Sequence, residues 1–341
     1  MSDERPGLLA GAIWPAENTK LFGHDEAQAF LSQSYRSGKG HHAVLIEGPE
    51  GIGKATLAFR FANYVLSNPD PATAPAAIGD PDAASAVSRQ IASGASHNLL
   101  YLSRPVDEKT GKVKSAITVD EVRRAGRFFS QTSGTGNWRI VIIDPADDMN
   151  RNAANAILKI LEEPPKRALF LVLSHAPGKL LATIRSRCLP LKLSPLDNSA
   201  LGAALANLGV TGSDASMISI AKGSVGEALK LLNYGGGEII AAYNEVLSAQ
   251  GPTARKAMHR LADALSGKDS DTIFEFFVSH VGDDLMHRAR HAAQAGELST
   301  AERLARLQSD INERLAVSNA YNLDRKQTIL SILGDIKQPG L

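Results

Sequence analysis

Four short apolar runs recur in the first half of the chain, at residues 43–46, 99–102, 138–144 and 169–173, the third ending in a carboxylate. Runs of this length without polar interruption are typical of strands covered on both faces of a parallel sheet. Before and between these runs the apolar residues return to helical spacing, at 25–37, 54–65, 118–130 and 151–163. Alternating strands and helices predict an α/β fold with a parallel sheet and crossover helices in three layers.

The pattern changes beyond Leu196, where strand-like runs disappear and only helical spacing remains. Three consecutive glycines at 235–237 are expected to form a flexible hinge before a set of longer helices. Residues 68–85 contain four prolines and many alanines, which favours an extended or mobile surface insertion over packed structure. The sequence therefore predicts an α/β region followed by an all-α region.

Composition limits the classes of function. The 341 residues carry Lys+Arg 37 against Asp+Glu 36, a net charge of +1, so no global excess of positive charge drives binding to nucleic acid or to an anionic membrane. Any nucleic-acid contact must be local or shared with partners. The single cysteine, Cys188, excludes an internal disulfide and a cysteine-rich zinc site and fits a reducing cytoplasm. Without a signal pattern or an apolar run of roughly 20 residues, we expect a soluble intracellular protein.

A glycine loop follows the first predicted strand, and its sequence fits G-x-x-x-x-G-K. In such a loop the backbone N–H groups and the lysine bind phosphate oxygens. The next residue should be Ser or Thr, whose hydroxyl binds Mg²⁺, but it is Ala55, and Thr56 lies about 100° further round the helix. The predicted nucleotide- or phosphate-binding residues are Gly48, Gly51, Gly53, Lys54, Ala55, Thr56, Asp144 and Ser174.

Asp144 ends an apolar strand, where P-loop proteins keep the carboxylate that holds Mg²⁺. In hydrolysing members a glutamate usually follows and polarises the attacking water, whereas this chain has Pro145. Asp147 and Asp148 are close in sequence but out of register. The pattern therefore indicates a phosphate site that lacks two groups needed for hydrolysis.

Other residues that could carry chemistry have plainer interpretations. His287 and His291 lie one helical turn apart, but without a third ligand they predict a solvated helix face and no metal site. His41 and His42 are interpreted in the same way. No base is paired in sequence with Cys188, so we expect a small packed thiol.

Several motifs together resemble the bacterial clamp-loader subunits of the AAA+ class, which serve DNA polymerase III. They are LFGH at 21–24, the glycine loop, Asp144, LEEPP at 161–165 and SRC at 186–188. The resemblance covers about residues 21–232 by motif and the remainder by length and position only. It implies an AAA+ P-loop core with a parallel sheet (1–194, with the insertion at 68–85), a small helical lid (195–234) and an all-α collar domain for oligomerisation (238–341).

Three departures from the ATPase members of this family point to a non-hydrolysing subunit. Ala55, Pro145 and Gly226 stand where the resemblance implies a Mg²⁺-binding hydroxyl, a catalytic acid and a lid arginine. The resemblance further implies that Arg187 reaches into a neighbour's ATP site as an arginine finger. The interval 83–98, where many relatives carry a four-cysteine zinc module, has no cysteine, so no zinc is expected.

The same resemblance implies the partners: other loader subunits in a five-membered ring, a sliding clamp, and primed DNA contacted through the assembly. It leaves open whether ATP or ADP binds, with weak or no Mg²⁺. Apolar faces of the collar, such as Leu304, Leu307 and Ile311, are expected to hold the ring together. Two alternatives remain at this stage: a catalytically active AAA+ ATPase, and a P-loop kinase acting on a small metabolite.

Overall fold

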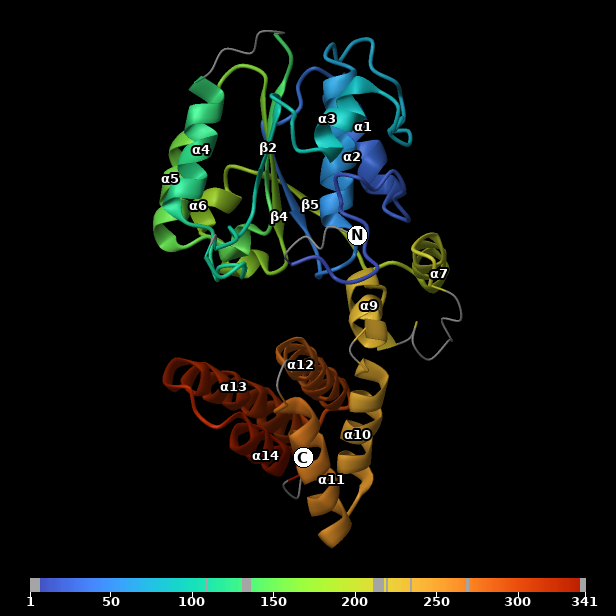
Figure 1. The fold of residues 1–341 in the computed structure, drawn as a ribbon, viewed down its shortest axis with the longest axis vertical. Coiled ribbons are helices and arrows are strands. Elements are labelled where there is room, and N and C mark those ends of the chain that lie inside the picture. Colours follow the sequence, from blue (N-terminus) through green and yellow to red (C-terminus); the bar gives the residue numbers. More distant parts are fainter. Residues whose placement is uncertain are drawn as a thin grey trace. The chain divides into compact units, whose positions relative to one another are not determined.

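The computed structural model describes residues 7–107, 109–130, 136–210, 218, 220–233, 235–267 and 270–337. Contacts divide the chain into two compact units, Met1–Leu229 and Lys230–Leu341. The first unit is built round a sheet and the second from helices (Figure 1). Among the described residues, no helix is both long enough and apolar enough to cross a membrane.

The sheet of the first unit has five strands, all paired in parallel, in the order β2-β3-β4-β1-β5. Their bounds are β1 Ala43–Glu47, β2 Leu99–Leu102, β3 Arg139–Ile143, β4 Ala168–Ser174 and β5 Leu189–Lys192. The four predicted strands are confirmed. The sequence did not predict β5, because Pro190 interrupts its short apolar pattern, and the structure places it at the sheet edge beside β1, where proline is tolerated.

Helices cover both faces of this sheet (Figure 1). One layer contains α1 (Asp25–Arg36), α2 (Lys54–Ser67) and α3 (Ala86–Ala92), and the other contains α4 (Val119–Ser130), α5 (Arg151–Glu162) and α6 (Ala182–Arg185). Alternate residues of β1 point to opposite faces, so Val44 and Ile46 join one core while Ala43 and Leu45 join the other. This confirms the predicted three-layer α/β core.

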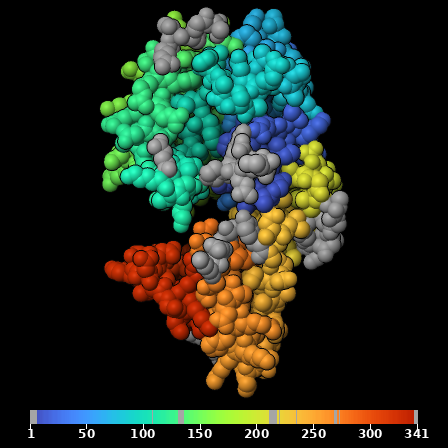
Figure 2. Space-filling view, in the orientation of Figure 1, coloured from blue at the N-terminus to red at the C-terminus, as the bar shows by residue number. Residues whose placement is uncertain are grey.

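The insertion at 68–85 contains no helix or strand, but part of it is packed. Ala74 and Ile78 are buried, and Asp80 pairs with Arg60 at 2.8 Å and with Lys20 at 2.5 Å. Its cyan-blue atoms lie on the visible surface of the first unit (Figure 2). The expected surface loop is therefore held to α2 by Arg60 and to the segment before α1 by Lys20, and Ala74 and Ile78 add apolar contacts.

After β5 the chain forms α7 (Asn198–Asn207) and α9 (Val225–Asn233). The second unit then contains only helices among its described residues, which confirms the predicted change to all-α structure. These helices are α10 (Gly236–Ser248), α11 (Gly251–Leu265), α12 (Asp271–Gln294), α13 (Leu298–Tyr321) and α14 (Arg325–Ile336). Buried aromatic and aliphatic side chains such as Tyr243, Phe277 and Ile329 fill its core.

Two expectations about the second unit differ from the structure. The glycines at 235–237 were expected to form a flexible hinge, whereas the structure has Gly236 and Gly237 in the first turn of α10. Gly235 caps this helix with φ 66°, and a Cβ on Gly236 would lie 2.9 Å from the Cα of Leu231. Leu304, Leu307 and Ile311 are only 2%, 8% and 3% exposed, so they fill the core of this unit and do not present an apolar surface to a partner. The helical spacing was correct, but spacing alone does not distinguish an internal neighbour from an external one.

Candidate functional site

The parallel sheet brings the predicted phosphate-binding residues together, because parallel strands end at the same edge. The glycine loop follows β1, Asp144 follows β3, and Ser174 ends β4. Gly53 is the N-cap of α2 with φ 102°, and Gly51 has φ 74°, conformations that favour glycine. The loop therefore has the strand-loop-helix form that the sequence predicted.

Lys54, the first residue of α2, points into the loop and is only 4% exposed. Its Nζ donates to the carbonyl of Gly48 at 2.6 Å and to that of Pro49 at 2.5 Å. Burial lowers the pKa of Lys54 to about 8, against the opposing effect of nearby carboxylates, of which Asp144 has the largest. The cation is thus bonded to carbonyls of its own loop.

Asp144 lies next to this lysine at the end of β3. It accepts a hydrogen bond at 2.9 Å from the hydroxyl of Tyr101 on β2. Burial raises the pKa of Asp144 above the usual range for an aspartate, and burial likewise raises the pKa of the Tyr101 hydroxyl. Sequence analysis did not assign a role to Tyr101; the signal was its hydroxyl within an otherwise aliphatic run.

Ser174 does not face an open site. Its Oγ donates to Asp147 Oδ1 at 2.8 Å, and the backbone N–H of His175 donates to Asp147 Oδ2 at 2.6 Å. Asp147 lies in the short helix η1 (Ala146–Asp148) that follows β3. Its role is therefore to tie the ends of β3 and β4 together, which its position in the sequence did not suggest.

The start of α9 lies directly against the glycine loop. The hydroxyl of Ser224 donates to the carbonyl of Glu50 at 2.8 Å, and the backbone N–H of Gly226 donates to the carbonyl of Gly51 at 3.2 Å. A Cβ on Gly51 would lie 2.8 Å from the Cα of Gly226. The loop is consequently covered at Gly51 by backbone from a segment more than 170 residues away in sequence.

These contacts decide how well a nucleotide and Mg²⁺ fit the loop. Ala55 offers no oxygen to a metal ion, Lys54 is bonded to loop carbonyls, and α9 covers Gly51. A phosphate group would have to displace these contacts before the loop N–H groups and the lysine could reach it. The residues present therefore do not fit a tightly bound Mg²⁺-nucleotide in this conformation.

Arg187 lies apart from the loop, two residues after α6. Its Nη2 pairs with Glu162 Oε1 at 2.8 Å, its Nη1 donates to the carbonyl of Thr183 at 2.9 Å, and its side chain is 34% exposed. The structure thus joins the LEEPP and SRC motifs through one ion pair. The neighbouring Arg185 is exposed at the end of α6.

The remaining residues that could carry chemistry include Cys188, His41 and His42, which lie in packed or stacked positions and form no metal site in the described part of the chain. Cys188 is buried, which confirms the predicted packed thiol, and burial raises the pKa of this thiol to about 11. His41 and His42 stack at 4.5 Å, and His42 Nε2 donates to the carbonyl of Leu161 at 3.0 Å, so His42 is not merely solvated. Among the described residues, no group of three or more His, Cys, Asp or Glu side chains could hold a metal ion.

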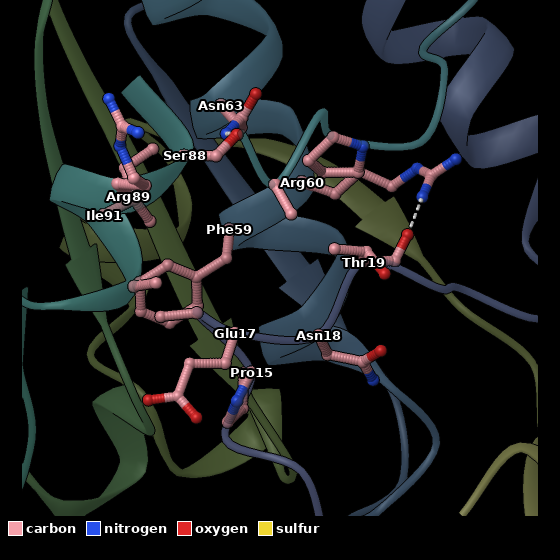
Figure 3. Close-up of a pocket in the computed structure, with 14 residues that line it drawn as sticks. Pro15, Glu17, Asn18, Thr19, Phe59, Arg60, Asn63, Ser88, Arg89 and Ile91 are labelled. Carbon is pink, nitrogen blue, oxygen red and sulfur yellow. Dashed lines mark hydrogen bonds between the residues drawn. The ribbon is translucent and has the colours of Figure 1, made fainter. Parts of the chain in front are cut away.

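A separate cavity of ≈ 100 Å³ lies between α2, α3 and the N-terminal segment (Figure 3). Phe59 and Ile91 contribute apolar walls, and Arg60 donates to the carbonyl of Thr19 at 3.1 Å beside it. None of the residues predicted from the sequence to bind phosphate lines this cavity. It is distinct from the glycine loop.

The sequence of this chain is similar to those of DNA polymerase III subunits. Residues 23–197 match the family described as DNA polymerase III, delta subunit. The chain is 38% identical over 161 residues to DNA polymerase III subunit delta-prime of Pseudomonas aeruginosa, covering 47% of this chain and 45% of that protein. It is 32% identical over 158 residues to the delta-prime subunit of Escherichia coli, covering 46% and 44%.

A more distant relative is DNA polymerase III subunit tau of Escherichia coli, 28% identical over 190 residues, with 56% of this chain and 27% of that protein covered. A gamma subunit-related protein of Thermotoga maritima superposes loosely, with a TM-score of 0.40 and 17% identity over 90% of this chain and 98% of that one. The chain spans about half the length of the delta-prime subunits it matches. The family match over half of the sequence shows that this chain belongs to the family described as DNA polymerase III, delta subunit, and its relatives at 38% and 32% identity are delta-prime subunits.

Proposed function

We propose that this chain acts as the non-hydrolysing delta-prime-type subunit of a DNA polymerase III clamp loader. The observation that carries the proposal is the glycine loop: it lacks a Mg²⁺-binding hydroxyl at Ala55 and an acid at Pro145, and Lys54 is bonded to the loop itself. Mg²⁺ and a water-orienting group supply most of the catalysis in P-loop hydrolases. A subunit of this construction contributes to a loader without turning over ATP.

Arg187 is the group through which the chain would act on a neighbouring ATPase subunit. A guanidinium is permanently charged and planar, so it stabilises charge on a transferring phosphoryl group when it enters the site from outside. Arg187 is partly exposed and is followed by the buried Cys188, which fixes the backbone beside it. The proposed partners are the other subunits of a five-membered ring, a sliding clamp, and primed DNA reached through the assembly, in the cytoplasm.

The test is reconstitution with the ATPase-type loader subunits and the clamp of the same organism. Arg187→Ala should assemble normally while clamp- and DNA-stimulated ATP hydrolysis and clamp loading decrease. Lys54→Ala in this subunit serves as the comparison and should leave both rates unchanged, because this loop does not turn over ATP. Wild-type loading by the Arg187→Ala complex would show that Arg187 is not a finger.

A catalytically active AAA+ ATPase remains the second candidate, favoured by the intact pair of Lys54 and Asp144 next to one another. ATP turnover by the isolated chain, abolished by Lys54→Ala, would establish it. The third interpretation, a kinase acting on a small metabolite, receives no support from the relatives, which are replication subunits.

A further inference from the structure

Two sequence motifs that are 25 residues apart meet at one ion pair, Arg187 with Glu162 at 2.8 Å. Glu162 is the last residue of α5, and Arg187 follows α6. A second bond, from Arg187 Nη1 to the carbonyl of Thr183 at 2.9 Å, holds the other end of the guanidinium. Two bonds to two different anchors fix both the position and the plane of the group.

The pair leaves much of the guanidinium available. Arginine has five N–H donors in a planar fork, and these two contacts use one on each terminal nitrogen. Within the described part of the chain, the structure gives the guanidinium no third partner. The remaining donors can therefore bind an anion presented from outside the chain while the two anchoring bonds stay in place.

The end of α5 that carries Glu162 is fixed to the rest of the first unit by burial and by a hydrogen bond. Leu161 beside it is 1% exposed, and its carbonyl accepts a hydrogen bond at 3.0 Å from Nε2 of His42. His42 directly precedes β1. After Glu163, Pro164 and Pro165 restrict the chain beyond the helix. The carboxylate is thus attached to a helix end that is fixed to the sheet.

The ion pair contributes little to folding. The Arg187 and Glu162 side chains are 34% and 48% exposed, and ion pairs between exposed side chains have small effects on stability. What the pair does change is conformational freedom, because an unrestrained arginine must lose much of its rotamer entropy each time it binds an anion. The ion pair therefore restricts the orientation of the Arg187 side chain and adds little to the free energy of unfolding.

We propose that Glu162 is a positioning residue for Arg187, holding its guanidinium in the orientation in which it enters the phosphate site of a neighbouring subunit. This inference rests on the proposed function of Arg187 as a finger. Glu162 touches neither nucleotide nor reacting atoms and acts only through the arginine.

The test compares Glu162→Gln with Glu163→Gln in the reconstituted loader, because Glu163 is the adjacent exposed glutamate at the end of the same helix. If Glu162 restrains the arginine, Glu162→Gln should lower the kcat of stimulated ATP hydrolysis by roughly three- to tenfold. The KM for ATP should not change, because the binding loop lies on the neighbour. Glu163→Gln should match wild type, and all variants should assemble and melt as wild type does.

A double variant separates positioning from other roles. Arg187→Ala combined with Glu162→Gln should be no slower than Arg187→Ala alone, since Glu162 has no effect without its arginine. Additive losses, failure of Glu162→Gln to assemble, or a wild-type rate for Glu162→Gln beside a slow Arg187→Ala would each overturn the positioning role and leave the finger intact. A wild-type rate for Arg187→Ala would overturn both proposals at once.

Discussion

Gly51 and Gly226 pack backbone against backbone, although one lies in the glycine loop and the other is in the first turn of α9. The N–H of Gly226 donates to the carbonyl of Gly51 at 3.2 Å, and a Cβ on Gly226 would lie 3.0 Å from the Cα of Gly51. Gly226 stands where the family resemblance implies a lid arginine. The structure places a close backbone contact at this position, where a side chain on residue 226 would meet the glycine loop.

Gly51→Ala should destabilise the first unit. The added Cβ meets Ser224 and Gly226, and alanine is strained at φ 74°, so we expect a loss of about 2 to 4 kcal/mol. Gly126→Ala is the control, since Gly126 lies inside α4 with open space around it and should stabilise the helix by about 0.5 to 1 kcal/mol. Urea unfolding followed by the fluorescence of Trp14 and Trp138 reports on this unit. Equal effects of the two substitutions would contradict the close packing.

Lys54 should make the stability of the first unit depend on alkaline pH. Its folded pKa is about 8, whereas an unfolded lysine keeps its proton to about pH 10.4. Between these values the unfolded state binds more protons, so the free energy of unfolding rises with pH and the contribution of this group is smallest below about pH 8.

Lys54→Met removes that dependence and makes the measurement specific. From about pH 7.5 to about pH 9.5, the wild-type protein should gain on the order of 1 to 2 kcal/mol more stability than the variant. The other titrating groups are common to both proteins and cancel in the difference. Parallel pH profiles would mean that the amine is not buried as described.

The isolated chain should turn over ATP at less than about 10⁻³ s⁻¹, the range of a P-loop hydrolase without its arginine finger. ATP and ADP should bind with a Kd of about 1 mM or weaker, because Lys54 must first leave the carbonyls of Gly48 and Pro49. Chelating Mg²⁺ should leave that binding unchanged, since Ala55 supplies no ligand. Calorimetry and a phosphate-release assay measure the two quantities, and micromolar, Mg²⁺-dependent binding would contradict this reading of the loop.

Arg187→Lys should restore little of the activity lost in Arg187→Ala. Lysine keeps the charge but lacks the planar fork. An arginine finger raises the rate of phosphoryl transfer by about 10³- to 10⁵-fold at the site that it serves. Arg185→Ala, which removes an exposed arginine two residues away, is the matched control and should load clamps at the wild-type rate. A larger loss in Arg185→Ala than in Arg187→Ala would transfer the role to Arg185.

The helical second unit should be needed for assembly but not for folding of the first unit. A fragment of residues 1–233 ends with α9 complete and retains all five strands. Because each unit has its own core, we expect this fragment to fold while no longer co-purifying with the other loader subunits. Circular dichroism and pull-down measure the two outcomes, and retained assembly would place the subunit contacts on the first unit.

The sequence by itself determined the type and order of most elements. Uninterrupted apolar runs identified β1, β2, β3 and β4, and the spacing of G-x-x-x-x-G-K located the turn between β1 and α2, because strand burial and phosphate-loop geometry both depend on local sequence. The losses at Ala55 and Pro145 could be read directly, since they concern which chemical groups are present.

Only the tertiary structure decided what those groups face. Lys54 could have pointed at solvent or ligand, but the fold turns it to the carbonyls of Gly48 and Pro49. Leu304 has the spacing of a binding surface and instead fills a core, and Glu162 meets Arg187 only because α5 and α6 lie on the same face of the sheet. Local sequence fixes periodicity and chemistry, whereas the partner of each side chain depends on contacts between residues distant in sequence, which no local pattern encodes.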